Sequence, residues 1–485
     1  MMDTHDGDPL FCEGANCVAL ARCNRLAFLI DGQQYFEALI EALPKAERRI
    51  VIVGWDFDAR TPLRPHLAPN RPTDPNVLPL GSFLRRLVET RPGLDLYVLI
   101  WRNSIFYGSN PIPVPIGSEW WQHPRIHFKL DDHHPLGASH HQKIVCIDGK
   151  VAFMGGMDLT QGRWDGTRHV PDEPGRVDTF GKPYDPVHDL QVVVDGEIAC
   201  SICSLADYRW RYATGEHLPP VSSDGDPWPD SVEPAIRDHR AALARTQPAY
   251  GEQPAAREIE QLNTAFLEAA NDYIYLETQY FSLPGITDIL MRHLQRPDGP
   301  EIIIVVTKRS SGMIEQYVMA ENRDRLFAYL RGADKYGRLR AYYPVSRMSP
   351  ECEIKIHSKL LIADDRLLKI GSSNMNARST GLDSECDLAV HAGRPDAIAA
   401  VRRLRDTLLG EHVGADADTF AHTLDRAGGS LIVAVEALSR GDRRLIPYHA
   451  GERSDQVSLT PGSSILDPDQ PLDLGYVLGK MTNSS

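Results

Sequence analysis

The chain has 485 residues, of which 42% are hydrophobic, and its formal net charge is −14 at pH 7. This composition allows a sizeable buried core. It disfavours a general nucleic-acid binder, which would need a basic face, and it disfavours adsorption to an anionic membrane through bulk charge.

The apolar pattern of the first 230 residues predicts alternating strands and helices. In chain order these are a strand at 26–30, a helix at 35–47, a strand at 49–53, a helix at 80–90, a strand at 94–101, a hairpin at 139–158, a strand at 189–194 and a helix at 199–212. A Pro-rich loop at 58–79 and a long loop at 102–137 interrupt the order. The long loop contains Trp120 and Trp121, which would suit insertion at a lipid interface.

The same order restarts after a Pro-containing linker at 215–230. The expected elements are strands near 241–245, 272–276, 301–307, 339–343 and 385–390, helices at 258–270, 286–295, 313–331, 395–411 and about 417–440, and a second hairpin at 356–374. Gly428-Gly429 weakens the last helix. The pattern predicts an α/β fold of two fused pseudo-symmetric halves, 1–230 and 231–450, with one active site at the seam. A polar tail at 451–485 follows.

One motif occurs in both hairpins and reads H-x-K-x4-D-x6-G-[GS]. Its landmarks are His141, Lys143 and Asp148 in the first copy, and His357, Lys359 and Asp364 in the second. Histidine and lysine two residues apart on a strand share one face. Asp148 and Asp364 lie at the expected turns, so we assign them a structural role through hydrogen bonds that brace the hairpins.

Two such hairpins face to face would suit a phosphodiester. One histidine would attack phosphorus, the other would protonate the leaving oxygen, and Lys143 and Lys359 would hold the phosphoryl oxygens. The symmetry of the motif leaves the order of His141 and His357 open. Fixed ammonium groups can neutralise developing charge, so no metal or cofactor is expected in the reaction. No C-x2-C pair has the partner pair that would predict a zinc site.

The chain resembles the phospholipase D superfamily, which is named for this H-K-D motif. The resemblance rests on both motif copies and on His140-His141-Gln142-Lys143, Gly155-Gly156-Met157-Asp158-Leu159, Gly162-Arg163-Trp164-Asp165, His188-Asp189, 274–281 and Ser373-Asn374-Met375-Asn376. It covers roughly residues 25–410 and is similar to the eukaryotic-type catalytic core without accessory lipid-binding domains. It implies that His141 is the nucleophile, which forms a phosphohistidine, and that His357 is the acid and then the base that activates water.

The resemblance also implies supporting residues. In the family an asparagine at the position of Asn374 hydrogen-bonds phosphate, whereas the first-half counterpart here is the acidic Asp158. Asp189 and Glu385 begin the strands that follow the hairpins, and such carboxylates orient a histidine through Nδ1. Asp387 is a rival to Glu385.

Aromatic residues near the motifs suggest a head-group contact. Trp164 or Tyr280 could bound a quaternary ammonium group by cation–π contact.

The expected function is that of a phospholipase D that hydrolyses a glycerophospholipid, phosphatidylcholine before others, to phosphatidic acid and free head group. Its covalent intermediate would also allow transfer to small alcohols. The alternatives are a phosphatidyltransferase such as a cardiolipin or phosphatidylserine synthase, a superfamily nuclease, and a non-enzymatic lipid-binding protein. The lack of membrane helices weakens the first, the acidic balance weakens the second, and the two intact motifs weaken the third.

The expected partner is a phospholipid at a peripheral membrane surface, without nucleic acid. Ca²⁺ could stimulate activity at that surface without being required. Glu13, Arg22 and Arg25 interrupt the apolar residues near the N-terminus, so no cleaved signal peptide is expected. Cytoplasmic localisation is the default expectation, export by a route without a cleaved signal stays open, and the sequence leaves the oligomeric state open.

Overall fold

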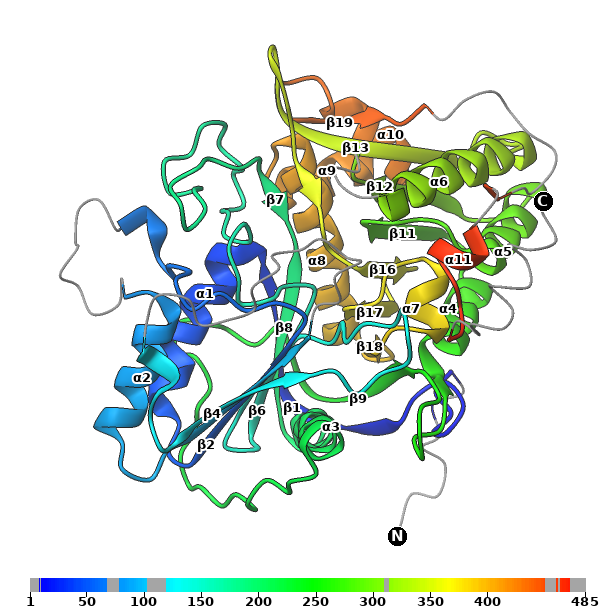
Figure 1. Ribbon diagram of the computed structural model, residues 1–485. Coiled ribbons are helices and arrows are strands. Elements are labelled where there is room, and N and C mark those ends of the chain that lie inside the picture. Colours follow the sequence, from blue (N-terminus) through cyan, green and yellow to red (C-terminus); the bar gives the residue numbers. More distant parts are fainter. Residues whose placement is uncertain are drawn as a thin grey trace, which may run out of the picture.

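Strands from both halves of the chain form one continuous sheet (Figure 1). The computed structural model describes residue 8 and residues 10–67, 78–102, 119–308, 314–449, 459–460 and 463–471. The α/β fold expected from the sequence is confirmed. Among the described helices, none combines the length and apolarity that a membrane span requires.

The elements of the N-terminal half run from β1 to α3. Its strands are β1 (Ala19–Ile30), β2 (Arg49–Gly54), β3 (Asp95–Trp101), β4 (Ile126–Asp131), β5 (Ile144–Ile147), β6 (Val151–Gly155), β7 (Val187–His188) and β8 (Leu190–Asp195). Its helices are α1 (Asp31–Ala42), α2 (Leu80–Thr90) and α3 (Glu197–Thr214), with short 3-10 turns at Leu43–Lys45, Pro65–Leu67 and Glu119–Trp121.

The C-terminal half runs from β9 to α11. Its strands are β9 (Ile236–Gln247), β10 (Ala256–Arg257), β11 (Tyr273–Thr278), β12 (Glu301–Val306), β13 (Leu339–Met348), β14 (Glu351–Glu353), β15 (Lys355–Ile356), β16 (Leu360–Ala363), β17 (Leu367–Gly371), β18 (Glu385–His391) and β19 (Arg444–Pro447). Its helices are α4 (Glu258–Ala269), α5 (Pro284–Gln295), α6 (Ile314–Ala333), α7 (Ala377–Gly381), α8 (Pro395–Val413), α9 (Ala417–Arg426), α10 (Leu431–Leu438) and α11 (Ser463–Leu466).

The two halves repeat one strand order. Neighbouring strands follow β4–β3–β2–β5–β6–β8–β1 in the first half and β13–β12–β11–β16–β17–β18–β9 in the second. The first three strands of each series are parallel and the rest are antiparallel. β1 and β9 pair antiparallel, from Ala19 opposite Leu243 to Leu26 opposite Ile236, and so join the halves. The domain boundaries expected at residues 230 and 450 stay predictions.

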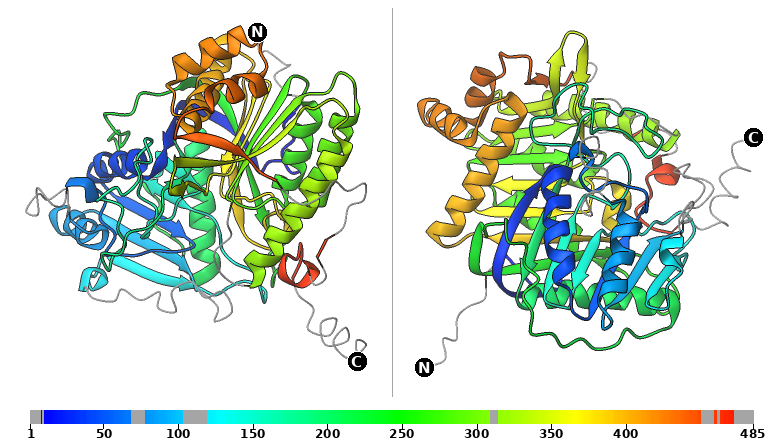
Figure 2. Two further views of the ribbon diagram at one scale, coloured as in Figure 1. Left: turned by 90° about the horizontal axis from the view of Figure 1, so that it is seen from above. Right: turned by 90° about the vertical axis from the view of Figure 1, so that its left-hand side faces the viewer.

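Helices cover both faces of the sheet. α3 and α8–α10 pack on one face and share a core with strands of both halves. On the other face α1 and α2 cover the N-terminal strands, and α4, α5 and α6 cover the C-terminal strands. Figure 2 (left) shows the outer helices of the N-terminal half, in blue, and those of the C-terminal half, in green, on opposite sides of the molecule. A sheet covered on both faces explains why β2 and β11 are buried along their whole length.

The structure corrects three expectations from the sequence. The loop expected at 102–137 contains β4, an edge strand that pairs parallel with β3; residues 103–118 lie outside the described part. The helix expected at about 417–440 is two helices, because Gly428 (φ 66°) and Gly429 (φ 89°) adopt left-handed conformations between α9 and α10. Finally, the His-x-Lys segments precede the strands β5 and β16 instead of lying within them.

The expected tail at 451–485 lies largely outside the described residues. The part that is described, at 463–471, includes α11, which packs against α6.

Candidate active site

Each His-x-Lys segment is held by the opposite half of the chain. The backbone N–H of His141 donates to Ser384 O at 2.8 Å, and that of His357 donates to His188 O at 2.8 Å. Ser384 and His188 each stand one residue before a predicted supporting carboxylate. Therefore the same backbone contact that fixes each histidine also brings a carboxylate of the other half beside its ring.

The histidine rings contact these carboxylates through Nδ1. Nδ1 of His141 lies 3.0 Å from Glu385 Oε2, and Nδ1 of His357 lies 2.6 Å from Asp189 Oδ2. The rival Asp387 instead accepts hydrogen bonds from Lys369 and Ser373. This arrangement leaves Nε2 of each catalytic candidate for substrate.

The two motif lysines make different contacts, and so do Asp158 and Asn374, which follow the first and the second hairpin. Lys143 Nζ lies 3.1 Å from Asp158 Oδ2, whereas Lys359 Nζ donates to the backbone oxygen of His357. Asp158 Oδ1 also accepts the backbone N–H of Trp55 at 2.8 Å, so this carboxylate is committed to protein contacts. The side-chain oxygen of Asn374 accepts no hydrogen bond within the described part of the chain. Asn374 and Asp158 both line the cavity, but Asp158 Oδ2 pairs with Lys143, whereas the amide oxygen of Asn374 has no such partner among the described residues.

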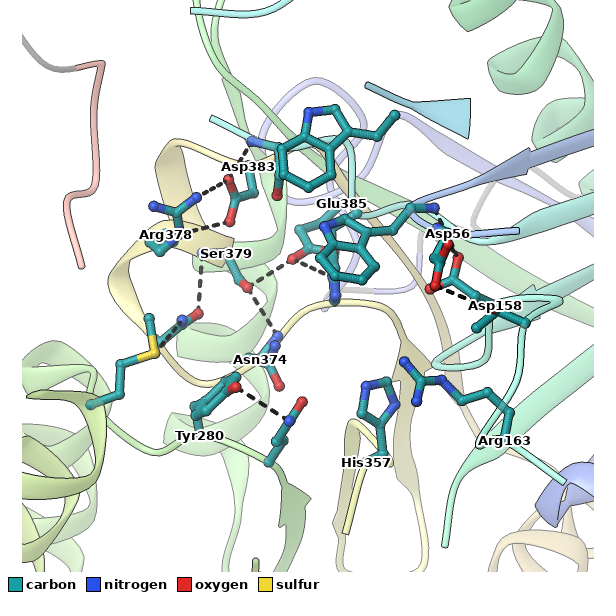
Figure 3. A pocket seen from close by; sticks show the side chains of 18 of the residues that line it. Asp56, Asp158, Arg163, Tyr280, His357, Asn374, Arg378, Ser379, Asp383 and Glu385 are labelled. Carbon is teal, nitrogen blue, oxygen red and sulfur yellow. Dashed lines mark hydrogen bonds and ion pairs between the residues drawn. The ribbon is translucent and has the colours of Figure 1, made fainter. Parts of the chain in front are cut away.

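One cavity of about 470 Å³ brings the two halves of the site together (Figure 3). His141, His357, Asn374, Tyr280 and Glu385 line it. The lining also includes residues that sequence reasoning did not assign to the site, namely Trp55, Trp101, Arg163, Lys355, Arg378, Ser379 and Asp383. Arg163 stood within a segment that carried the family resemblance, which was a usable signal. No sequence pattern pointed to Lys355, Arg378 or Trp101, because only the fold brings these residues to the cavity.

The expected contact of Trp164 with a head group is wrong. Its ring is buried, stacks on His66 with ring centroids 5.5 Å apart, and does not line the cavity. Trp55 takes the position at the cavity wall instead, where it stacks on Trp101 with centroids 5.5 Å apart.

The expected lipid-facing role of Trp120 is also wrong. Trp120 is 2% exposed and packs against Phe57, because Gly81 leaves room for its ring. Its neighbour Trp121 is 40% exposed.

Burial and like charges favour the neutral forms of both histidines, and burial lowers the pKa of Lys359 as well, when no substrate is bound. Burial, and then Lys143 and Lys359, hold the pKa of His141 well below its usual range; burial and Lys359 do the same to the pKa of His357. Burial lowers the pKa of Lys359 to about 7. A phosphodiester anion in the cavity would favour the protonated forms, since an opposite charge stabilises a cation.

The motif aspartates lie away from the cavity and make matching contacts in the two halves. The carboxylate of Asp148 accepts backbone N–H groups of residues 47–49 at 2.7, 2.8 and 2.7 Å. That of Asp364 accepts those of residues 271–273 at 2.8, 2.8 and 2.9 Å. Each aspartate thus ties a hairpin turn to the start of the neighbouring strand, β2 or β11.

The chain is similar in sequence to one family model and to several known proteins. A family model described as "Cardiolipin synthase, PLD-like domain" matches residues 264–405. The chain is 24% identical over 424 residues to phospholipase D A of Dictyostelium discoideum, covering 74% of this chain and 32% of that protein. It is 24% identical over 501 residues to phospholipase D1 of Saccharomyces cerevisiae, covering 81% and 29%.

Plant proteins and one solved structure are similar over a larger share of their length. Phospholipase D alpha 1 of Arabidopsis thaliana is 21% identical over 529 residues, covering 80% of this chain and 65% of that protein. The chain therefore spans about a third of the first two relatives and just under two thirds of the plant one. The crystal structure of phosphatidylserine synthase from Haemophilus influenzae Rd KW20 has the same fold, with 14% identity and a TM-score of 0.55 over 86% of this chain and 98% of that one.

Proposed function

The chain belongs to the phospholipase D superfamily, and from this premise we propose that it hydrolyses a glycerophospholipid at a membrane surface. The proposed substrate is phosphatidylcholine, and the products are phosphatidic acid and free head group. One observation carries the proposal: two histidines, each with Nδ1 on a buried carboxylate of the opposite half, share one cavity that cationic side chains also line.

The proposed reaction has two steps that use one histidine as nucleophile. Nε2 of His141 attacks phosphorus, the bond from phosphorus to the head-group oxygen breaks, and His357 gives its Nε2 proton to that oxygen. His357 then takes a proton from water, the resulting hydroxide attacks phosphorus, and the P–N bond breaks to restore His141. A small alcohol in place of water would give transfer of the phosphatidyl group.

Fixed positive groups would stabilise the charge that develops on the phosphoryl oxygens. We assign this role to Lys143 and Lys359, which are not among the residues that line the cavity, and to two lining residues, Asn374 through its amide N–H and Arg163 beside His357 (Figure 3). The head group carries the opposite charge, a quaternary ammonium cation. Trp55 and Tyr280 line the cavity and offer aromatic faces to this cation.

The experiment that tests the function measures choline release from phosphatidylcholine vesicles beside cleavage of plasmid DNA. Choline release without DNA cleavage is expected. Because the family model is described as cardiolipin synthase, phosphatidylglycerol is added as an acceptor in a parallel reaction, and cardiolipin as the main product would favour a phosphatidyltransferase. Inactivity in all three assays with intact, folded protein would favour a lipid-binding protein.

Chelation of metal ions by EDTA should leave the chemical step intact, because side chains are proposed to stabilise the charge on the phosphoryl oxygens. With a monomeric short-chain substrate and EDTA present during the assay, we expect turnover within about twofold of the untreated rate. Immediate loss that Zn²⁺ or Mg²⁺ restores would show a metal ion acting on the substrate. A moderate Ca²⁺ effect that appears only on vesicles would reflect the lipid surface.

Catalytic efficiency should fall as the pH rises through about 7. The pKa of Lys359 is lowered to about 7, first by burial and then by Lys143, so this lysine loses its charge above that pH in the free enzyme. Because kcat/KM reports the free enzyme, its value for a soluble phosphodiester should fall, by up to about tenfold per pH unit. Lys359→Arg keeps the charge and should remove this alkaline decline, even at a lower absolute rate. A wild-type profile that stays flat to pH 9 would contradict the assignment.

A further inference from the structure

A buried cluster of histidines and carboxylates lies outside the substrate cavity, where the two halves meet. Asp31, His169 and His188 come from the N-terminal half and Glu411 comes from α8 in the C-terminal half. All four are buried, and Asp31, His169 and His188 have no measurable exposure. None of them lines the cavity that holds His141 and His357.

One potential ligand atom from each of the four residues lies within 4.8 Å of the others, close enough for a single ion to contact all four. Nε2 of His169 lies 2.9 Å from Glu411 Oε1 and 3.4 Å from Asp31 Oδ2. Nδ1 of His188 lies 3.0 Å from Glu411 Oε1 and 3.0 Å from Asp31 Oδ1. Nitrogen and oxygen ligands about 2.0–2.1 Å from a tetrahedral zinc ion are about 3.3 Å apart, so these separations leave room for an ion after small adjustments.

Both imidazoles present their second nitrogen to another carboxylate. Nδ1 of His169 lies 2.9 Å from Asp165 Oδ2, and Nε2 of His188 lies 3.0 Å from Glu277 Oε2. Carboxylates in this outer position fix the tautomer and orientation of histidines that bind metal ions. Without a metal, both nitrogens of each ring would have to carry a proton for the same contacts to be favourable.

Two further observations point to a ligand in this cluster. Asp31 and His169 adopt left-handed backbone conformations, with φ of 63° and 45°, which cost energy in a non-glycine residue and are found where a side chain must be aimed. Oδ2 of Asp31 and Oε2 of Glu411 are buried and accept no hydrogen bond within the described part of the chain. Buried carboxylate oxygens without donors are costly unless a cation compensates them.

The formal charges leave a deficit that a divalent ion would offset. Four carboxylates, those of Asp31, Glu411, Asp165 and Glu277, gather around the two imidazoles. The nearby guanidinium groups are those of Arg176, which pairs with Asp165, and Arg443, which lies 3.7 Å from Glu411. With neutral imidazoles, the sum is two negative charges in a buried site, which a divalent ion would offset; with both imidazoles protonated, the same charges balance without an ion.

We propose that Asp31, His169, His188 and Glu411 bind one divalent transition-metal ion, zinc by its preference for this ligand set. Four protein ligands make the site closed, so the ion is structural and does not contact substrate. It clamps α8 of the C-terminal half to the N-terminal half. It also supports the active site, because Asp31 Oδ1 accepts the backbone N–H of Asp189 at 3.1 Å and His188 holds the backbone of His357.

The test is the metal content of the full chain, which does not depend on activity. The protein is produced in zinc-supplemented medium, purified without metal-affinity resin, and dialysed against metal-free buffer before elemental analysis. About one zinc per chain is expected. Protein loaded with Co²⁺ in place of zinc should show the intense visible absorption of a tetrahedral site with nitrogen and oxygen ligands.

Two ligand variants and one matched control complete the test. His169→Gln and Glu411→Gln should lower the zinc content at least tenfold. His293→Gln should not, because this buried histidine lies outside the cluster and, within the described part of the chain, its ring hydrogen-bonds to the backbone oxygen of Leu267. Folded wild-type protein with less than a tenth of an equivalent of zinc, and no rise in Tm when zinc is added, overturns the proposal. So does full zinc content in both ligand variants. If the variants do not fold, the wild-type zinc content and cobalt spectrum decide, and an octahedral spectrum overturns the ligand set.

Discussion

His357→Ala protein mixed with p-nitrophenyl phosphocholine should accumulate a phosphohistidine on His141. The p-nitrophenolate group leaves as a stable anion and needs little protonation, so the first step proceeds without His357. The second step needs a base to activate water, and that base is missing. The covalent intermediate should therefore outlive a quench and digestion, and mass spectrometry of the peptide that contains His141 would identify it.

The matched control for this prediction is His141→Ala, which keeps the acid but removes the nucleophile. We expect no adduct and no gain from the better leaving group. The environments of the two rings are similar, since each has a buried carboxylate on Nδ1 and a lowered pKa. An adduct on His357 in the His141→Ala protein would reverse the assigned roles.

Lys143→Ala should abolish activity while the protein stays folded. Lys143 is 3% exposed, pairs with the cavity-lining Asp158 at 3.1 Å, and is assigned above to the charge of the phosphoryl group. Loss of one such stabilising group costs on the order of 10²–10³ in kcat, and removal of the lysine also leaves the Asp158 carboxylate unpaired beside an anionic substrate, so we expect the upper end of that range. Thermal unfolding of the variant measures whether the fold survives.

Asp148→Asn should do the opposite and lower stability with little effect on the activity of the folded fraction. Its carboxylate accepts three backbone N–H groups, and an amide would turn a donor toward at least one of them. We expect the free energy of unfolding to fall by about 2–4 kcal/mol. Asp364→Asn provides the matched change in the second half. A variant as stable as wild type but inactive would contradict the structural assignment.

The sequence predicted the site best where a short motif repeats. Both copies of the H-K-D motif, the alternating strands and helices and the duplicated order were readable because hydrophobic periodicity and hairpin turns are local properties. The strand β4 was missed because its neighbours in sequence resemble a loop, and it is pairing with β3 that makes the segment a strand. Trp164 was misassigned because nothing local distinguishes an aromatic ring in the core from one in a cavity.

By itself the sequence determined that there are two equivalent hairpins, which residues they present, and that the chain folds as two similar α/β halves. Only the tertiary structure decided how those hairpins are completed. Pairing of β1 with β9 and of each His-x-Lys segment with the opposite half places Glu385 on His141 and Asp189 on His357. The same packing brings His169 and His188 to Glu411. These contacts join residues more than 150 positions apart. A sequence pattern does not show which distant side chains meet. The arrangement of the halves, which decides this, is fixed only when both faces of the sheet are buried.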